Sequence, residues 1–295
     1  MARMLKGLRI HYGSLKAALF FVVVWLFLAL CWVLAGSRLS SLIWFIIPGI
    51  AFSIFAYWCS SNFAIIAMHA TEVSEEEEPV LYAMVRDLSA RIGKPMPRVM
   101  VSPYESPNAF ATGRSERHAS ICCTRGLINI LNERELRSVI GHELTHIYNH
   151  DILASSLATA TATVLTYVGS WLVYVGDTYR RDIRKYCKFI GKFLNILFAP
   201  IASVIINAII PGSREFDADK GGGEITGDFA ALASALNKIT YGMQLHEMKS
   251  TAGLQAVASL MIICPWNDNS SAIVRLCAAR PTVQDRIGRL MSIAA

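Results

Sequence analysis

Charged residues are scarce in this chain of 295 residues. Asp, Glu, Lys and Arg make up only 17% of it, whereas an average soluble domain has about a quarter. Hydrophobic residues make up 54%, and internal repeats and low-complexity tracts are missing. This balance excludes a disordered or fibrous chain and argues against a wholly soluble globule. The distribution of the apolar residues therefore decides the class of protein.

Cysteine pairs with the spacing of a disulfide framework or a zinc–thiolate site are also missing. The seven cysteines are an odd number and contain no Cys-x-x-Cys pair, so we expect free thiols in a reducing compartment. The net charge of +6 comes largely from a basic N-terminal flank and a basic segment at 180–192. This placement favours a membrane surface, and not nucleic acid, as the partner.

The sequence does have long apolar blocks, and they lie at 17–35, 39–70, 152–176 and 193–210. A bilayer core requires roughly 20 helical residues, so the first two blocks predict transmembrane helices. The third block is long enough to span but is rich in Ser and Thr. The fourth is shorter and contains Asn and Pro. For these two blocks a buried helix in a soluble core, or a hairpin that does not span, stays open.

Basic residues next to the blocks indicate an orientation. Four Lys and Arg residues in 1–16 favour a cytoplasmic N-terminus, and two spans within 17–70 then return the chain to the cytoplasm. Lys and Arg residues near spans tend to stay on the cytoplasmic side. If both later blocks span, the six Lys and Arg residues at 180–192 lie outside and conflict with this tendency. Either those blocks form a non-spanning hairpin, or the first two spans fix the topology.

The segment that follows the first two spans has the patterning of a soluble domain. Apolar residues at helical spacing, with Pro79 in the first turn and Gly93 at the end, predict a helix over 79–92. Short strands are predicted over 98–101 and 119–124, and the Pro, Asn and Gly residues between them indicate turns.

The next predicted helix carries a metal-binding motif. Asn132, three residues before Glu135, predicts the helix cap, and the predicted buried stripe consists of Leu136, Val139, Ile140, Leu144 and Ile147. The helix contains His142-Glu143-Leu144-Thr145-His146. Two histidines at i and i+4 share one helical face and can bind one zinc ion. Glu143 can take a proton from water that zinc activates and later pass it to a leaving amine.

A catalytic zinc usually has a third protein ligand. His150 continues the i+4 series, but ~12 Å of helix separates it from His142, so we expect it on the surface. The favoured candidate is Arg214-Glu215-Phe216-Asp217-Ala218-Asp219. Glu215 and Asp219 share a helical face there. Glu215 would be the third ligand, and Asp219 could accept a hydrogen bond from a ligand histidine.

Taken in order, these motifs resemble the HtpX family of bacterial membrane zinc proteases, relatives of the CAAX prenyl proteases. The resemblance covers nearly the whole chain. Besides the two N-terminal spans and two further apolar blocks, it includes Pro107-Asn108-Ala109-Phe110-Ala111-Thr112-Gly113, Thr124-Arg125-Gly126-Leu127, Leu136, Gly141-His142-Glu143-Leu144-Thr145-His146, Asn149 with Asp151, and Arg214 to Asp219.

The resemblance implies a gluzincin-type site and a substrate-binding edge strand. One zinc ion per subunit would be held by His142, His146 and Glu215, with Glu143 as the base and Asp219 behind a ligand histidine. An edge strand after Asn108 would hold the substrate extended. The implied substrates are misfolded membrane proteins or unfolded polypeptides, in quality control or a stress response. The implied location is the bacterial inner membrane, with the active site facing the cytoplasm and no role for nucleic acid.

The expected fold class is a mainly α membrane protein with a gluzincin-like α+β metalloprotease domain and a small sheet. We expect a basic N-terminus at 1–16, two transmembrane helices at 17–70 and the first part of the protease domain at 71–151. Two apolar helices at 152–210 are then inserted between the zinc ligands, and 211–295 form the second part of the domain. The oligomeric state stays open.

Two departures from the family and three rival functions complete the expectations. Arg280 stands where the family has a histidine, and either substitutes as a cationic donor or only pairs on the surface. Gly221–Gly223 predict that the Glu215 helix ends early or is flexible, and Asp228 is expected to cap the last soluble helix. The rivals are a zinc-binding membrane scaffold without turnover, a transporter, and the same chemistry directed at prenylated peptides.

Overall fold

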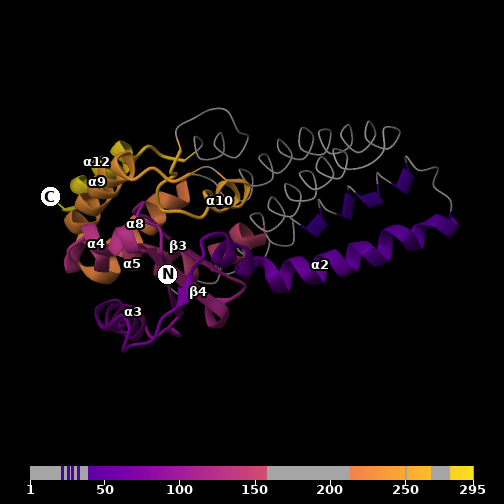
Figure 1. Ribbon diagram of the computed structural model, residues 1–295, viewed down its shortest axis with the longest axis horizontal. Coiled ribbons are helices and arrows are strands. Elements are labelled where there is room, and N and C mark those ends of the chain that lie inside the picture. The colour runs from indigo at the N-terminus through magenta and orange to yellow at the C-terminus, as the bar shows by residue number, and fades with distance from the viewer. Residues whose placement is uncertain are drawn as a thin grey trace, which may run out of the picture.

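The computed structural model describes residues 39–157, 213–249, 251–266 and 280–294, with isolated helical residues between 21 and 33. The principal elements are α2 (Leu39–Ala67), β1 (Thr71–Glu72), α3 (Pro79–Arg91), β2 (Arg98–Ser102), β3 (Ala109–Gly113), β4 (Ala119–Thr124), α4 (Arg125–Ile130), α5 (Glu133–Tyr148), α8 (Ser213–Thr226), α9 (Phe229–Leu245), α10 (Ala252–Val257) and α12 (Val283–Ala294). The described residues form a helix-rich fold with a small mixed sheet, which agrees with the expected protease domain (Figure 1). The fourth apolar block and the basic segment at 180–192 lie outside the described residues.

The sheet is mixed and has the strand order β1-β2-β4-β3. β2 and β4 run parallel, and β3 pairs antiparallel with β4 from Ala109 opposite Cys123 to Gly113 opposite Ala119. The two strands predicted from composition are confirmed as β2 and β4. The edge strand implied after Asn108 is confirmed as β3, so Gly113 belongs to a strand and not to one of the expected turns.

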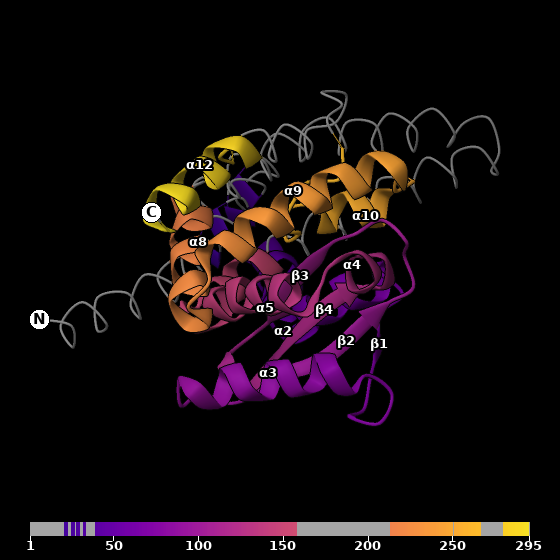
Figure 2. The same ribbon diagram turned by 90° about the vertical axis from the view of Figure 1, so that its left-hand side faces the viewer.

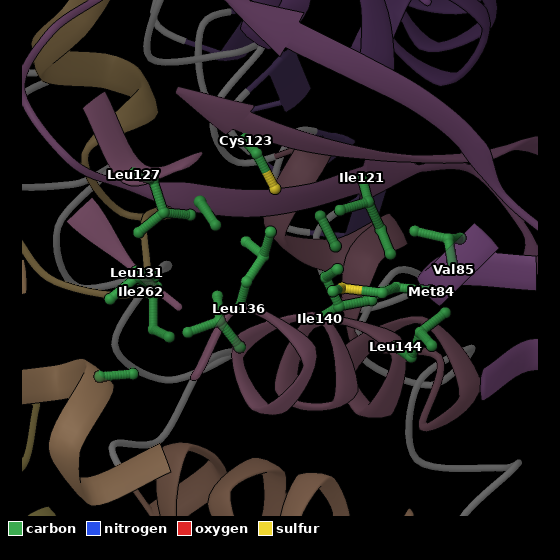
Figure 3. Close-up of a cluster of buried hydrophobic side chains, with 14 of the residues drawn as sticks. Met84, Val85, Ile121, Cys123, Leu127, Leu131, Leu136, Ile140, Leu144 and Ile262 are labelled. Carbon is green, nitrogen blue, oxygen red and sulfur yellow. The ribbon is translucent and has the colours of Figure 1, made fainter. Parts of the chain in front are cut away.

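Alternation along the strands gives the sheet two buried faces. Ile121 and Cys123 of β4 point toward α5, where Leu136 and Ile140 meet them, and α3 packs on the same side (Figure 3). Phe110 and Cys122 point to the other face of the sheet. They belong to a second cluster, with Met68 directly after α2 and with residues around α10. Figure 2 shows α3 and α9 on opposite sides of the strands and α5.

The second apolar block forms α2, which extends away from the sheet and the helices around it (Figure 1). Among the described residues, no single helix is long and apolar enough to cross a bilayer alone. The pair Gly49–Cys59 and Ser61–Ala67, which bends by 60°, meets the requirement of length and composition together. Large apolar side chains on this helix are exposed, among them Ile47 and Trp58.

Two smaller expectations have opposite outcomes. Asp228 caps α9 as predicted, because its carboxylate accepts a hydrogen bond from the backbone N–H of Ala231 at 2.9 Å. However, α9 is not the last helix, since α10 and α12 follow it. Among the cysteines that the structure describes, Cys59, Cys122 and Cys123 are free thiols, as expected.

Candidate metal centre

The motif helix α5 begins at a complete capping box. The Asn132 side chain accepts a hydrogen bond from the Glu135 N–H, and the Glu135 carboxylate accepts one from the Asn132 N–H, each at 3.0 Å. All five residues of the predicted apolar stripe are buried. A capped start and a buried stripe fix the rotation of the helix, so His142 and Glu143 point inward and are 0% and 1% exposed.

The glycine triplet does not end α8, and the expectation that it would is wrong. α8 runs from Ser213 to Thr226 without interruption. A Cβ on Gly222 would lie 2.7 Å from the backbone nitrogen of His142, and a Cβ on Gly221 would lie 2.5 Å from Cγ2 of Thr145. The glycines therefore allow the α8 backbone to lie directly against α5. This close approach brings Glu215 and Asp219 to the histidines.

Replacing Gly222 with alanine is expected to destabilise the protein by about 1–3 kcal/mol, because the new methyl group overlaps the backbone of α5. Zinc affinity is expected to fall with it, since α8 carries Glu215. Gly288 on α12 is the matched control, because a Cβ at that position would have nothing within 4 Å of it. Alanine there is expected to stabilise by about 0.5–1 kcal/mol. Unfolding in mild detergent measures both, and equal effects would contradict the packing role.

His142, His146 and Glu215 converge on one point. Their ligand atoms all lie within 4.8 Å of one another. The two histidine Nε2 atoms are 3.2 Å apart, and the Glu215 carboxylate oxygens lie 3.6 Å from Nε2 of His142 and 3.9 Å from Nε2 of His146. His150 is not part of this group. It follows the end of α5 and faces Glu116 at 3.4 Å.

Asp219 lies behind the first histidine, and a buried arginine holds it. Oδ1 of Asp219 is 2.9 Å from Nδ1 of His142. Nε and Nη2 of Arg286 donate to the two Asp219 oxygens at 2.8 and 2.6 Å, and Nη1 lies 3.2 Å from Glu215. Reasoning from the sequence missed this role of Arg286. The available signal was its place four residues before Leu290, on the buried stripe of α12.

The chemistry of the donor set fits a cation. If Nδ1 of each histidine carries the ring proton, both Nε2 atoms carry lone pairs that face each other and Glu215, with no donor between them. Oε2 of Glu215 is buried without a hydrogen-bond partner. Burial lowers the pKa of His142 to about 4. Although burial raises the pKa of Glu215, Arg280 and Arg286 hold it far below its usual range. Two neutral imidazoles and a carboxylate are ligands that zinc accepts.

Glu143 lies beside this cluster. Both of its carboxylate oxygens are buried without a hydrogen-bond partner, and Glu143 and His146 line a common cavity with Ala111 and Arg280. Burial raises the pKa of Glu143 to about 7, although His146 lowers it. A carboxyl group with a pKa near neutrality can both accept and release a proton.

Arg280 is part of the cavity wall and does not form a surface ion pair. Its guanidinium donates to the carbonyl oxygens of Met261, at 2.5 Å, and Ser259, and it lies 3.5 Å from Oε1 of Glu215. Only 17% of the side chain is exposed. The arginine therefore holds the 259–261 backbone beside the cavity while its charge faces Glu215.

Strand β3 presents an edge to the same cavity. The Thr124 N–H donates to the Asn108 carbonyl at 3.0 Å. In an antiparallel pair, every second residue directs its N–H and C=O groups to the neighbouring strand. The backbone groups of Ala109, Ala111 and Gly113 therefore point away from β4. The carbonyl of Ala109 accepts from the Ile262 N–H at 2.9 Å, and the Gly113 N–H donates to Ser156 at 3.2 Å. Ala111, between them, borders the cavity.

Comparisons with known proteins give the family. The model of peptidase family M48 matches residues 75–294. A protein named Protease HtpX homolog from Bifidobacterium longum is 48% identical over 96% of this chain and 93% of its own. Another from Pseudarthrobacter chlorophenolicus is 43% identical over 96% and 97%. The crystal structure of S. mikatae Ste24p is similar to this chain over 98% of this chain and 65% of that chain, with 16% identity and a TM-score of 0.47. The chain belongs to peptidase family M48 and, within it, to the HtpX membrane proteases, and it is a metallopeptidase.

Proposed function

We propose that this protein is a zinc-dependent endopeptidase with one zinc ion per subunit, held by His142, His146 and Glu215. The observation that supports this most directly is the convergence of two Nε2 atoms and a carboxylate within 4.8 Å, with the unpartnered Glu143 beside them. When bound, zinc would supply Lewis-acid chemistry, which polarises a peptide carbonyl and activates water.

Glu143 is the proposed proton carrier. Its carboxylate takes a proton from the attacking water and delivers it to the nitrogen of the leaving amine. A pKa of about 7 supports both halves of this transfer at neutral pH. Because Glu143 is 1% exposed, bulk water does not compete for the proton. Asp219 fixes the orientation of His142 from behind.

The proposed substrates are extended polypeptides, with misfolded or unfolded membrane proteins as the physiological class. The main chain of the substrate would pair with Ala111 on the edge of β3, because the outward groups on either side already have partners at Ala109 and Gly113. Pairing through backbone groups is tolerant of sequence, which suits a quality-control protease in a stress response.

We place the enzyme in the bacterial inner membrane as a multi-pass protein, with the metal centre on the cytoplasmic side. The apolar blocks and the basic N-terminal flank support this, as does the exposed apolar surface of α2. The rival function, a zinc-binding scaffold without turnover, was suggested by Arg280 and the glycine triplet. The triplet no longer supports it, because these glycines form a packing contact between α8 and α5.

Metal removal tests the proposal. Purified protein in detergent is expected to hydrolyse casein, to lose that activity with a chelator, and to regain it when about one equivalent of zinc is added back. Zinc content measured beside activity separates protease from scaffold, since a scaffold retains zinc without cleavage. Activity that survives complete removal of metal would refute the metallopeptidase mechanism. A prenylated peptide as a second substrate tests whether lipidated chains are preferred.

A further inference from the structure

A second carboxylate, Asp151, faces the outer nitrogen of the second histidine. Oδ2 of Asp151 lies 3.5 Å from Nδ1 of His146, and both side chains are largely buried, at 14% and 17% exposed. The Asp151 carboxylate also forms an ion pair with Arg214. This arrangement repeats the one at His142, where Asp219 lies against Nδ1 and Arg286 holds Asp219.

The backbone is bent to bring Asp151 to this position. In a continuous helix, residue 151 would lie about 140° around the axis from residue 146 and would face away from it. Instead, α5 ends at Tyr148, and His150 adopts a left-handed conformation with φ of 60° before helix resumes at 151. Residues other than glycine adopt this conformation infrequently and at an energetic cost. The turn directs Asp151 back toward His146.

Arg214 links this turn to the helix that carries the third ligand. It directly precedes Glu215 on α8, and only 8% of its side chain is exposed. None of its three guanidinium nitrogens has a hydrogen-bond partner, so its burial is compensated by charge, from Asp151 in the ion pair and from the neighbouring Glu215. A buried charge is costly without such a partner. The pair therefore ties the turn that follows α5 to the start of α8.

We propose that Asp151 is the positioning residue for His146, held in place by Arg214, as Asp219 and Arg286 serve His142. By accepting a hydrogen bond from the Nδ1–H of His146, the Asp151 carboxylate keeps the Nε2 lone pair directed at Glu215 and His142, which is the orientation a ligand requires. Both histidines must be in this tautomer, since a proton on either Nε2 would occupy the point of convergence. The inference rests on the proposed zinc site.

Zinc affinity tests the role of Asp151 without depending on activity. The dissociation constant is measured by competition with a chromogenic chelator on the full chain in detergent. D151N and D151A are expected to weaken zinc binding by about 10- to 100-fold, as is typical when a carboxylate behind a ligand histidine is lost. D219N is the positive control. D87N is the matched negative control, because Asp87 is paired with Arg137 of α5 but is 44% exposed and contacts no histidine.

Two further measurements separate positioning from general structure. The visible spectrum of the cobalt-substituted protein is expected to change in D151N and not in D87N. Adding R214M to D151A is expected to change the dissociation constant by less than about twofold, because Arg214 acts through Asp151. The proposal is overturned if D151N and D151A bind zinc like wild type while D219N is weakened, or if neither variant folds, which would assign Asp151 a structural role. Wild-type protein that binds no zinc would instead refute the proposed function.

Discussion

Replacing Glu143 with glutamine is expected to lower kcat for casein hydrolysis by about 100- to 10,000-fold, the usual contribution of a general acid–base group. The amide has the size of the carboxyl group but cannot accept the proton of water. No ligand atom changes, so zinc content is expected to stay at one per chain. Initial rates and metal analysis on the same preparation measure both.

The control for this variant is E224Q. Glu224 also carries a carboxylate, but its side chain is 60% exposed and pairs with Lys220 at 3.8 Å. We expect wild-type rates from E224Q. Wild-type activity in the Glu143 variant would show that another group carries the proton and would remove the central residue of the proposed mechanism.

Replacing Arg286 with methionine is expected to destabilise the protein by about 3–5 kcal/mol, the cost typical of breaking a buried ion pair by removing one partner. The side chain is 3% exposed and contacts both Asp219 and Glu215. Methionine fills similar space but leaves two buried carboxylates without this countercharge. The measurement is the free energy of unfolding in mild detergent, in the presence of a chelator so that bound metal does not compensate.

R289M is the matched variant on the same helix. Arg289 lies over the ring of Phe216 at 4.7 Å, an exposed cation–π contact with an expected contribution of about 0.5–1 kcal/mol. A loss of similar size in the two variants would mean that Arg286 does not hold the acidic pair. With zinc present, the R286M effect is expected to shrink, because the cation itself neutralises Glu215.

The motif helix could be predicted from the sequence because its determinants are local. The cap at Asn132 and Glu135 and the spacing of apolar residues along α5 specify a start, a rotation and a buried face. The spacing of His142 and His146 then places two imidazoles side by side. The same holds for α3, for β2 and β4, and for the cap of α9 at Asp228.

The glycine triplet shows where local reasoning fails. Helix propensity disfavours three consecutive glycines, so the sequence predicted that the Glu215 helix ends early or is flexible. In the fold, the missing side chains allow α8 to lie within contact distance of the α5 backbone, and packing outweighs propensity. The local pattern did not show β3, although the resemblance implied an edge strand after Asn108, and the reason is related. Its turn-forming neighbours dominate the local signal, and only pairing with β4 makes Ala109–Gly113 a strand.

By itself the sequence predicted the family, through the order of its motifs, and the histidine pair, because helical spacing fixes which side chains share a face. Glu215 lies on another helix, and the packing of α8 against α5 brings it to the histidines. Only the tertiary structure decided how these residues are supported. It brought Arg286 to Asp219 from 67 positions away, Arg214 to Asp151, and Arg280 to the cavity. Such pairings depend on how α8 and α12 pack against α5, and charged side chains carry no periodic signal that shows which partner they meet.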